Sequence, residues 1–171
     1  TDINEPSVPH PDVLPSGAIV RMNSGHDSNL HRNMVLSVAK LYPQHFFNTS
    51  IPRLDFPGPV VLTVNPKEDT QWHHPPTAGV PANLMFVRIR VSPANKQLTH
   101  DAVRAWTAKQ VPVVLTFMRY YDAAVPVNTW NGVAAAYSFR THILNSYWCP
   151  TPEYIRAVMA EFADNRLVSM C

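Results

Sequence analysis

The sequence predicts an α/β fold in which crossover helices cover a mostly parallel sheet. Short apolar runs rich in β-branched residues alternate with stretches whose apolar residues recur at helical spacing. Parallel neighbours need a long crossover connection, usually a helix, so this alternation favours a parallel sheet. Six such runs are too few to close an eight-stranded barrel. We therefore expect an open sheet or a partial (β/α) barrel.

The elements follow from these runs and from the residues that punctuate them. Strands are expected over 17–23, 45–51, 59–65, 84–91, 111–118 and 166–171. Helices are expected over 28–43, 100–110, 132–144 and from 151 onward. Ser28, Thr99 and Thr151 are the expected N-caps, because a side-chain oxygen there accepts from the first free backbone N–H groups. Pro152 and Glu153 strengthen the last of these starts.

Composition points to one globular domain behind a short arm. Residues 1–17 are Pro-rich and polar and predict an extended N-terminal arm, and residues 18–171 predict a single α/β domain. Two cysteines fit a reducing compartment, and the chain has no apolar stretch of about 20 residues and no signal-peptide pattern. We expect a cytoplasmic protein without membrane contact. A net charge of +2 does not indicate a nucleic-acid partner.

Polar residues gather where the expected strands end, which is where open α/β sheets bind small molecules. The stretch "RMNSGHDSN" closes the first strand. Arg88 and Arg90 are two apart on the fourth strand and therefore share a face. A strand of a parallel sheet is usually buried, and a buried Arg needs an anion. The candidate anions are Asp55, Glu68, Asp69, and a ligand carboxylate or phosphate.

A second group of polar residues lies in one loop, "EDTQWHHPP". Glu68, Asp69, His73 and His74 offer nitrogen and oxygen ligands for a metal. Their spacing matches no metal-binding motif, and adjacent histidines on a loop point in different directions. We therefore predict a solvated loop here and no metal site.

Four phrases, in this order, give the chain a family resemblance: "PGPVVLTVNP", "LMFVRIRVSP", "VPVVLTFMRYYD" and "LNSYWCPTPE". From Gly17 on, the chain resembles radical S-adenosylmethionine (radical SAM) proteins of the type found in phages and metagenomes. The resemblance implies S-adenosylmethionine as a small-molecule ligand at the strand ends. The implied contacts are Asn23, Ser24, Gly25, His26 and Asp27 for the amino group, Thr63 and Asn65 for ribose and carboxylate, and Arg88 or Arg90 for further support.

The chain departs from that family at the iron–sulfur cluster. The family's chemistry needs a three-cysteine loop after its first strand, and this chain has only Cys149 and Cys171. A 4Fe-4S cluster is implied only if such a loop lies upstream, so the expectation is a fragment or form that is catalytic only with it. Two alternatives stay open. One is a non-catalytic binding or assembly module that holds a protein partner through its N-terminal arm, and the other is a cluster-independent, metal-dependent α/β hydrolase using Asp27, Glu68, Asp69 or the histidines.

Overall fold

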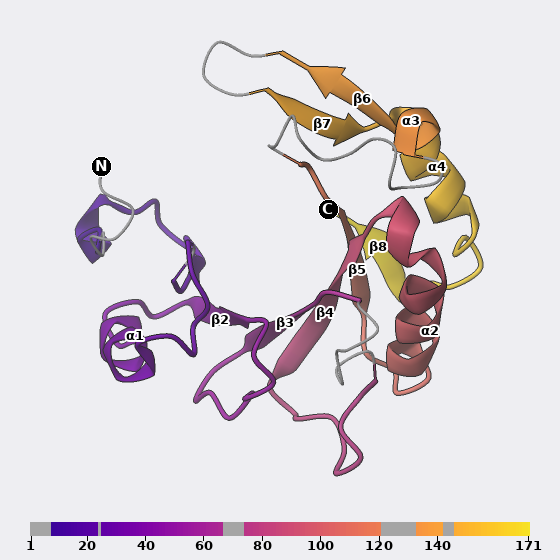
Figure 1. The fold of residues 1–171 in the computed structure, drawn as a ribbon. Helices are drawn as coiled ribbons and strands as arrows, with labels where there is room; N and C mark the ends of the chain where they lie inside the picture. The colour runs from indigo at the N-terminus through magenta and orange to yellow at the C-terminus, as the bar shows by residue number, and fades with distance from the viewer. Residues whose placement is uncertain (1–7, 24, 67–73, 121–132, 142–145) are drawn as a thin grey trace. The chain divides into compact units, whose positions relative to one another are not determined.

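The computed structural model describes residues 8–23, 25–66, 74–120, 133–141 and 146–171 and contains one sheet of six parallel strands with helices (Figure 1). The strand order is β1-β2-β3-β4-β5-β8. The strands are β1 Val20–Arg21, β2 His45–Thr49, β3 Val60–Val64, β4 Leu84–Val91, β5 Val113–Phe117 and β8 Val168–Met170. The helices are α1 Arg32–Ala39, α2 Lys96–Thr107, α3 Val133–Ala136 and α4 Pro152–Ala160. The predicted α/β class with a parallel sheet is confirmed, and the partial-barrel form stays a prediction.

The chain forms two compact units, which we describe separately. The first comprises residues 1–63 and 80–86, and the second comprises residues 64–79 and 87–171. The prediction of a single domain over residues 18–171 stays a prediction.

The core of the first unit is built on β2 and β3. Val60, Val61 and Leu62 are at most 1% exposed, because a central parallel strand is covered on both faces. Phe47 on β2 stacks on Phe56, with ring centroids 4.5 Å apart. In the N-terminal arm, Pro11–Val13 form a 3₁₀ turn, and the Tyr42 hydroxyl donates to the Pro9 carbonyl at 2.7 Å, which ties the arm to this unit.

The core of the second unit lies between α2 and one face of the sheet, where Figure 1 shows the helix running alongside β4 and β5. Alternate residues of these strands are buried at 0–2% exposure: Val87, Ile89, Val91, Val113 and Leu115. Ala102, Val103 and Trp106 of α2 are equally buried. Their spacing of one, three and four residues is that of a single helix face.

Three helix predictions need correction. The first helix begins at Arg32 and not after Ser28, because the Ser28 hydroxyl is buried and bonds the β1 and β2 backbones, donating to Met22 O and accepting from Asn48 N. The second begins at Lys96, four residues before the expected start, because it follows directly on a 3₁₀ turn, Pro93–Asn95, which begins with a capping box formed by Ser92 and Asn95. Thr99 lies inside that helix.

The third correction concerns the segment expected as a helix over 132–144. Only Val133–Ala136 are helical within the described part of it. Tyr137–Arg140 form β6, which pairs antiparallel with β7, Tyr147–Pro150. Aromatic residues favour strands, and Phe139 lies directly opposite Trp148 with ring centroids 5.1 Å apart. Cross-strand aromatic packing therefore outweighs the helical propensity of the alanines before it.

The last helix begins as predicted. The Thr151 hydroxyl accepts from the Tyr154 N–H at 3.2 Å, with Pro152 in the first turn, so the predicted cap is confirmed. In and around α1, Val35 and Ala39 are the buried residues, whereas Leu30, Met34 and Leu41 are 46–50% exposed. No helix in the described ranges is long and apolar enough to cross a membrane.

Two buried tyrosines provide a matched test of hydroxyl pairing. Tyr42 and Tyr137 are each 3% exposed, but the Tyr137 hydroxyl makes no hydrogen bond of good geometry within the described residues. We expect Tyr42→Phe to lower the free energy of unfolding by about 1 kcal/mol, because a hydrogen bond is lost. Tyr137→Phe should raise it by about 1 kcal/mol, because an unsatisfied buried group is removed. Chemical denaturation measures both, and equal losses would contradict this account of Tyr137.

Candidate functional site

Arg88 and Arg90 lie on one face of β4, as their spacing predicts. The residues between and beside them, Val87, Ile89 and Val91, occupy the opposite, buried face. Arg88 is partly buried, and Arg90 is exposed. The prediction that both arginines are buried is therefore wrong for Arg90, because no other layer of the described chain covers that position of the sheet face.

Neighbouring strands extend this face through their register. Val114 pairs with Arg88 and Thr116 with Arg90 across β4 and β5, and Ser169 of β8 pairs with Val114. Residues aligned across parallel strands point to the same side of a sheet. We call the surface formed by Arg88, Arg90, Val114, Thr116 and Ser169 the arginine face.

The two guanidinium groups have no ion-pair partner in the described part of the chain. Asp55, one of the anions expected for them, instead pairs with Arg32 at 3.0 Å and Arg53 at 3.2 Å. Glu68 and Asp69, the other expected acids, lie outside the described residues. Arginine stays charged at any physiological pH, so this face carries two positive charges available to a ligand.

A hydroxyl group on the same face also lacks a partner. The Thr116 Oγ1 atom is buried and has no hydrogen bond within the described residues. A buried polar atom without a partner is costly, and such atoms in native proteins point to strain, function or a missing ligand. Thr116 lies beside Arg90 in the register of β4 and β5.

A cluster of aromatic residues follows the carboxyl end of β5. Tyr120 pairs through its backbone with Trp148 of β7, and Tyr137 packs against Tyr120 and Tyr154 with ring centroids 5.6 and 6.0 Å apart. Burial raises the pKa of the Tyr137 and Tyr154 phenols, and the neighbouring Tyr120 phenol raises it further. These phenols therefore stay protonated at neutral pH. On the other side of β7, the Arg119 guanidinium lies 5.6 Å from the Tyr147 ring centroid.

The "NSGHD" stretch is organised around the Asp27 carboxylate. Its two oxygens accept hydrogen bonds from the hydroxyls of Thr49 and Ser50 and from the backbone N–H groups of Asn29, Ser50 and Ile51. Burial alone raises the pKa of Asp27, but the bonds from Thr49, Asn29 and Ser50 outweigh it and hold the pKa below its usual value. In this structure Asp27 joins the loop after β1 to the loop after β2.

The other residues of that stretch complete a turn. The His26 N–H donates to the Asn23 carbonyl at 3.0 Å, and the Asn23 side chain donates to the Asp27 carbonyl at 2.7 Å. Asn23 adopts a left-handed conformation with φ 52°, which asparagine tolerates. Gly25 has open space around its missing Cβ and no positive φ, so the turn does not require glycine. Ser24 lies outside the described residues.

The remaining predicted residues are placed separately. Thr63 is 6% exposed on β3, and its hydroxyl lies 3.5 Å from Asn48 Oδ1, at the limit of a hydrogen bond. Asn65 directly follows β3. Thr63 and the Asn23–Asp27 stretch belong to the first unit, whereas Asn65 and the arginines belong to the second. The predicted residues therefore belong to both units, and each set is described within its own unit.

Metal-ligating side chains do not gather in the described part of the chain. No group of three or more His, Cys, Asp or Glu residues is arranged there to hold a metal ion. His73, like Glu68 and Asp69, lies outside the described residues, and His74 is exposed.

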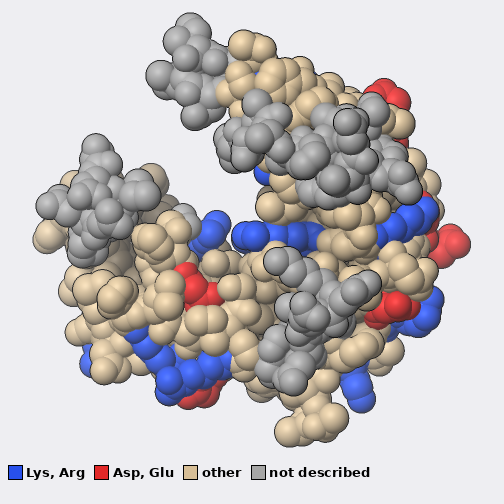
Figure 2. Space-filling model, in the orientation of Figure 1, with Lys and Arg blue, Asp and Glu red and all other residues tan. Residues whose placement is uncertain are grey.

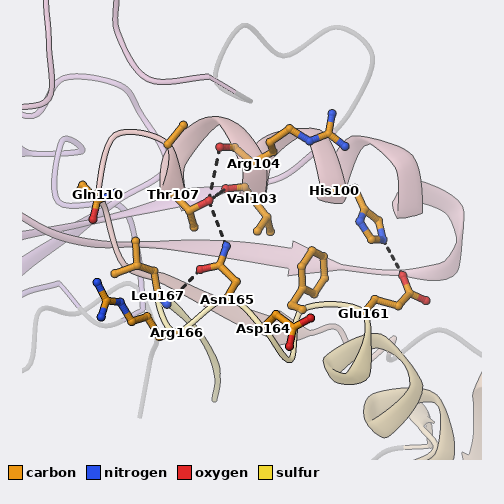
Figure 3. Close-up of a pocket in the computed structure, with 12 residues that line it drawn as sticks. His100, Val103, Arg104, Thr107, Gln110, Glu161, Asp164, Asn165, Arg166 and Leu167 are labelled. Atoms are coloured by element: carbon orange, nitrogen blue, oxygen red, sulfur yellow. Dashed lines mark hydrogen bonds and ion pairs between the residues drawn. The ribbon is translucent and has the colours of Figure 1, made fainter.

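A groove of about 660 Å³ lies on the helix side of the second unit, between α2 and the loop that follows α4 (Figure 3). At one end, Glu161 accepts from Lys96 at 2.7 Å and from His100 at 2.6 Å. Near the other, the Asn165 amide donates to the Thr107 hydroxyl at 3.2 Å. Both Glu161 oxygens are thus used to hold α4 to α2, a long-range contact that no local pattern in the sequence predicts.

The chain was compared with family models, curated proteins and solved structures, and none of the three comparisons found a match. Sequence reasoning found Arg88 and Arg90 but missed Ser169, because only the strand register brings that residue to the same face.

The Asp27 network predicts a pH-dependent stability. A carboxylate whose folded-state pKa is lowered contributes stability above its unfolded pKa of about 4, and the contribution is lost as pH falls through the folded pKa. We expect Asp27→Asn to lower the free energy of unfolding by about 1–3 kcal/mol at pH 7, with the difference shrinking below about pH 4. Denaturant titrations at several pH values measure this. Asp164→Asn, at an exposed residue without a hydrogen bond, is the control, and an equal loss at pH 7 and pH 3 would rule out the ionised network.

The contact between α2 and α4 predicts a small, salt-sensitive effect. Hydrogen bonding from Lys96 lowers the pKa of Glu161 despite partial burial, and His100 adds to this. We expect Glu161→Gln to cost at most about 1 kcal/mol, less in about 1 M salt, because the pair is partly exposed. Thermal melting at two salt concentrations measures the change. A Glu161→Gln effect that salt leaves unaltered would show that charge does not hold the helices together.

Proposed function

We propose that the protein binds a small anionic molecule on the arginine face. The observation that carries the proposal is the pair of guanidinium groups, Arg88 and Arg90, on one face of a sheet strand without an acid partner in the described residues. Guanidinium groups match carboxylate and phosphate oxygens in charge and in geometry. The unpartnered hydroxyl of Thr116 adds a neutral donor beside them.

The distribution of charge supports a small ligand over a polymer. In Figure 2, Lys and Arg atoms lie among uncharged and acidic atoms, and the net charge of the chain is only +2. A nucleic-acid interface typically presents a continuous basic surface that follows the phosphate backbone. Two arginines on adjacent positions of one sheet face suit a single anionic group better.

S-adenosylmethionine, the ligand that the family resemblance implies, fits this face in part. Its carboxylate suits Arg88 and Arg90. Its ammonium and sulfonium groups are positive, and the arginine face contains no acid to receive them. The two cysteines, Cys149 and Cys171, are too few for the three-cysteine loop that an iron–sulfur cluster of that family needs. We therefore derive no radical step, and S-adenosylmethionine is tested as a ligand whose carboxylate alone suits the arginines.

The proposal predicts the effect of removing each guanidinium. Methionine keeps the apolar stem and removes the charge, so Arg88→Met and Arg90→Met should keep the fold. Each should weaken binding of an anionic ligand about 10- to 100-fold, because a charge-assisted hydrogen bond contributes about 1.5–3 kcal/mol. Isothermal titration calorimetry with acetate, inorganic phosphate and S-adenosylmethionine measures the affinities.

Arg104→Met is the matched control for charge. Arg104 lies on α2, is 76% exposed and is 3.6 Å from Asp101, so its loss changes the net charge equally without touching the arginine face. Binding should stay unchanged in this variant. Equal weakening in all three variants would attribute binding to overall charge and reject the proposal, as would the failure of every anion to bind the unmodified chain.

A further inference from the structure

The composition of the arginine face also indicates which kind of anion it binds; this inference rests on the proposed function. We infer that the ligand carries a doubly charged, phosphate-type group and is not a monocarboxylate or a zwitterion. All four polar side chains of the face are hydrogen-bond donors or hydroxyls: Arg88, Arg90, Thr116 and Ser169. The fifth residue, Val114, is apolar.

The spacing of the two arginines fits one tetrahedral group. Residues two apart on a strand are about 6.6 Å apart, and long arginine side chains from such positions converge on a single group between them. A carboxylate has two oxygens with about four acceptor sites, and one bidentate guanidinium occupies a site on each oxygen. A phosphate monoester has three terminal oxygens, so a second guanidinium and a hydroxyl can each bind an oxygen of their own. A phosphate-type ligand therefore suits the pair of arginines better than a carboxylate does.

The charges of the two arginines also favour a phosphate-type ligand. Arg88 and Arg90 bring two positive charges to the face, and no described acid pairs with either of them. A dianion neutralises both, whereas a monocarboxylate leaves one guanidinium unpaired. A zwitterion adds a positive group to a surface on which the described residues offer it no acid. Coulomb energies near a protein surface amount to a few kcal/mol for charges in contact, enough to separate these ligand classes.

Thr116 supplies the neutral contact. Its buried Oγ1 has no partner in the described residues, and it lies beside Arg90 in the strand register. An oxygen of a phosphate-type group bound to Arg90 would accept this hydrogen bond. Thr116→Val removes the hydroxyl and keeps the shape, so it tests this contact without opening a cavity. Thr116→Ser restores the hydroxyl and is its matched control.

The test compares probes of different charge on the full chain by calorimetry. The probes are inorganic phosphate, sulfate, glycerol 3-phosphate and acetate. We expect the three doubly charged probes to bind at least about tenfold more tightly than acetate, and Arg88→Met and Arg90→Met to reduce that advantage each by about tenfold. Thr116→Val should weaken phosphate binding several-fold and Thr116→Ser should not. Tighter binding of glycerol 3-phosphate than of inorganic phosphate identifies an ester as the ligand, and the reverse identifies the free ion.

The outcomes separate this inference from the proposed function. If acetate binds as tightly as phosphate and both depend on Arg88 and Arg90, the anion site stands and the phosphate-type class is wrong. If S-adenosylmethionine binds at Arg88 and Arg90 more tightly than every doubly charged probe, the class is also wrong. If no probe binds, or if the affinities are the same in Arg88→Met and Arg90→Met as in the unmodified chain, the anion site itself is rejected.

Discussion

Side chains of β4 alternate between the two faces of the sheet, and the buried face determines where the arginines lie. Val87, Ile89 and Val91 pack beneath α2 at 0–2% exposure, a burial worth about 1.5–3 kcal/mol for each side chain. Shifting the strand by one residue would place Arg88 and Arg90 in that core, where an unpaired charge is prohibitively costly. The register that builds the core of the second unit therefore also presents both guanidinium groups together on the opposite face.

The Asp27 network shows the contrasting use of polar residues. A loop rich in Asn, Ser, His and Asp at a strand end has the composition of a ligand site, yet the Asp27 carboxylate already accepts hydrogen bonds from Thr49, Ser50 and the backbone beyond them. These hydrogen bonds satisfy the charge of the carboxylate within the chain, and they lower the pKa of Asp27. The arginine face has the opposite character, because its charges are left without acids in the described residues.

How far the sequence predicts this structure depends on the kind of signal. Val-rich runs located β3, β4 and β5 to within two residues at either end, because burial on both faces of a parallel sheet demands such composition. Helix starts were harder to predict, since Ser28 and Ser92 both have side chains that can cap a helix. Only the fold decides that Ser28 bonds the backbone at Met22 and Asn48, whereas Ser92 caps the 3₁₀ turn that leads into α2. Residues 137–140 form a strand because Phe139 packs against Trp148 on the neighbouring strand. Local propensity contains no information about such a cross-strand contact.

In the candidate site, too, local sequence predicts some features, and others depend on long-range contacts. The spacing of Arg88 and Arg90 predicted a shared face, since strand periodicity is local. Other features of the site depend on which strands are neighbours. These are the exposure of Arg90, the ion pairs of Asp55 with Arg32 and Arg53, and the position of Ser169 on the arginine face. Strand order is a long-range property, and a single sequence carries little information about it.

The most direct test of the account is a crystal structure of the chain grown with inorganic phosphate. The account predicts phosphate density between the Arg88 and Arg90 guanidinium groups, with one oxygen within hydrogen-bond distance of Thr116 Oγ1. A structure in which both guanidinium groups instead form ion pairs with carboxylates of the chain itself, and no phosphate occupies the face, would contradict it.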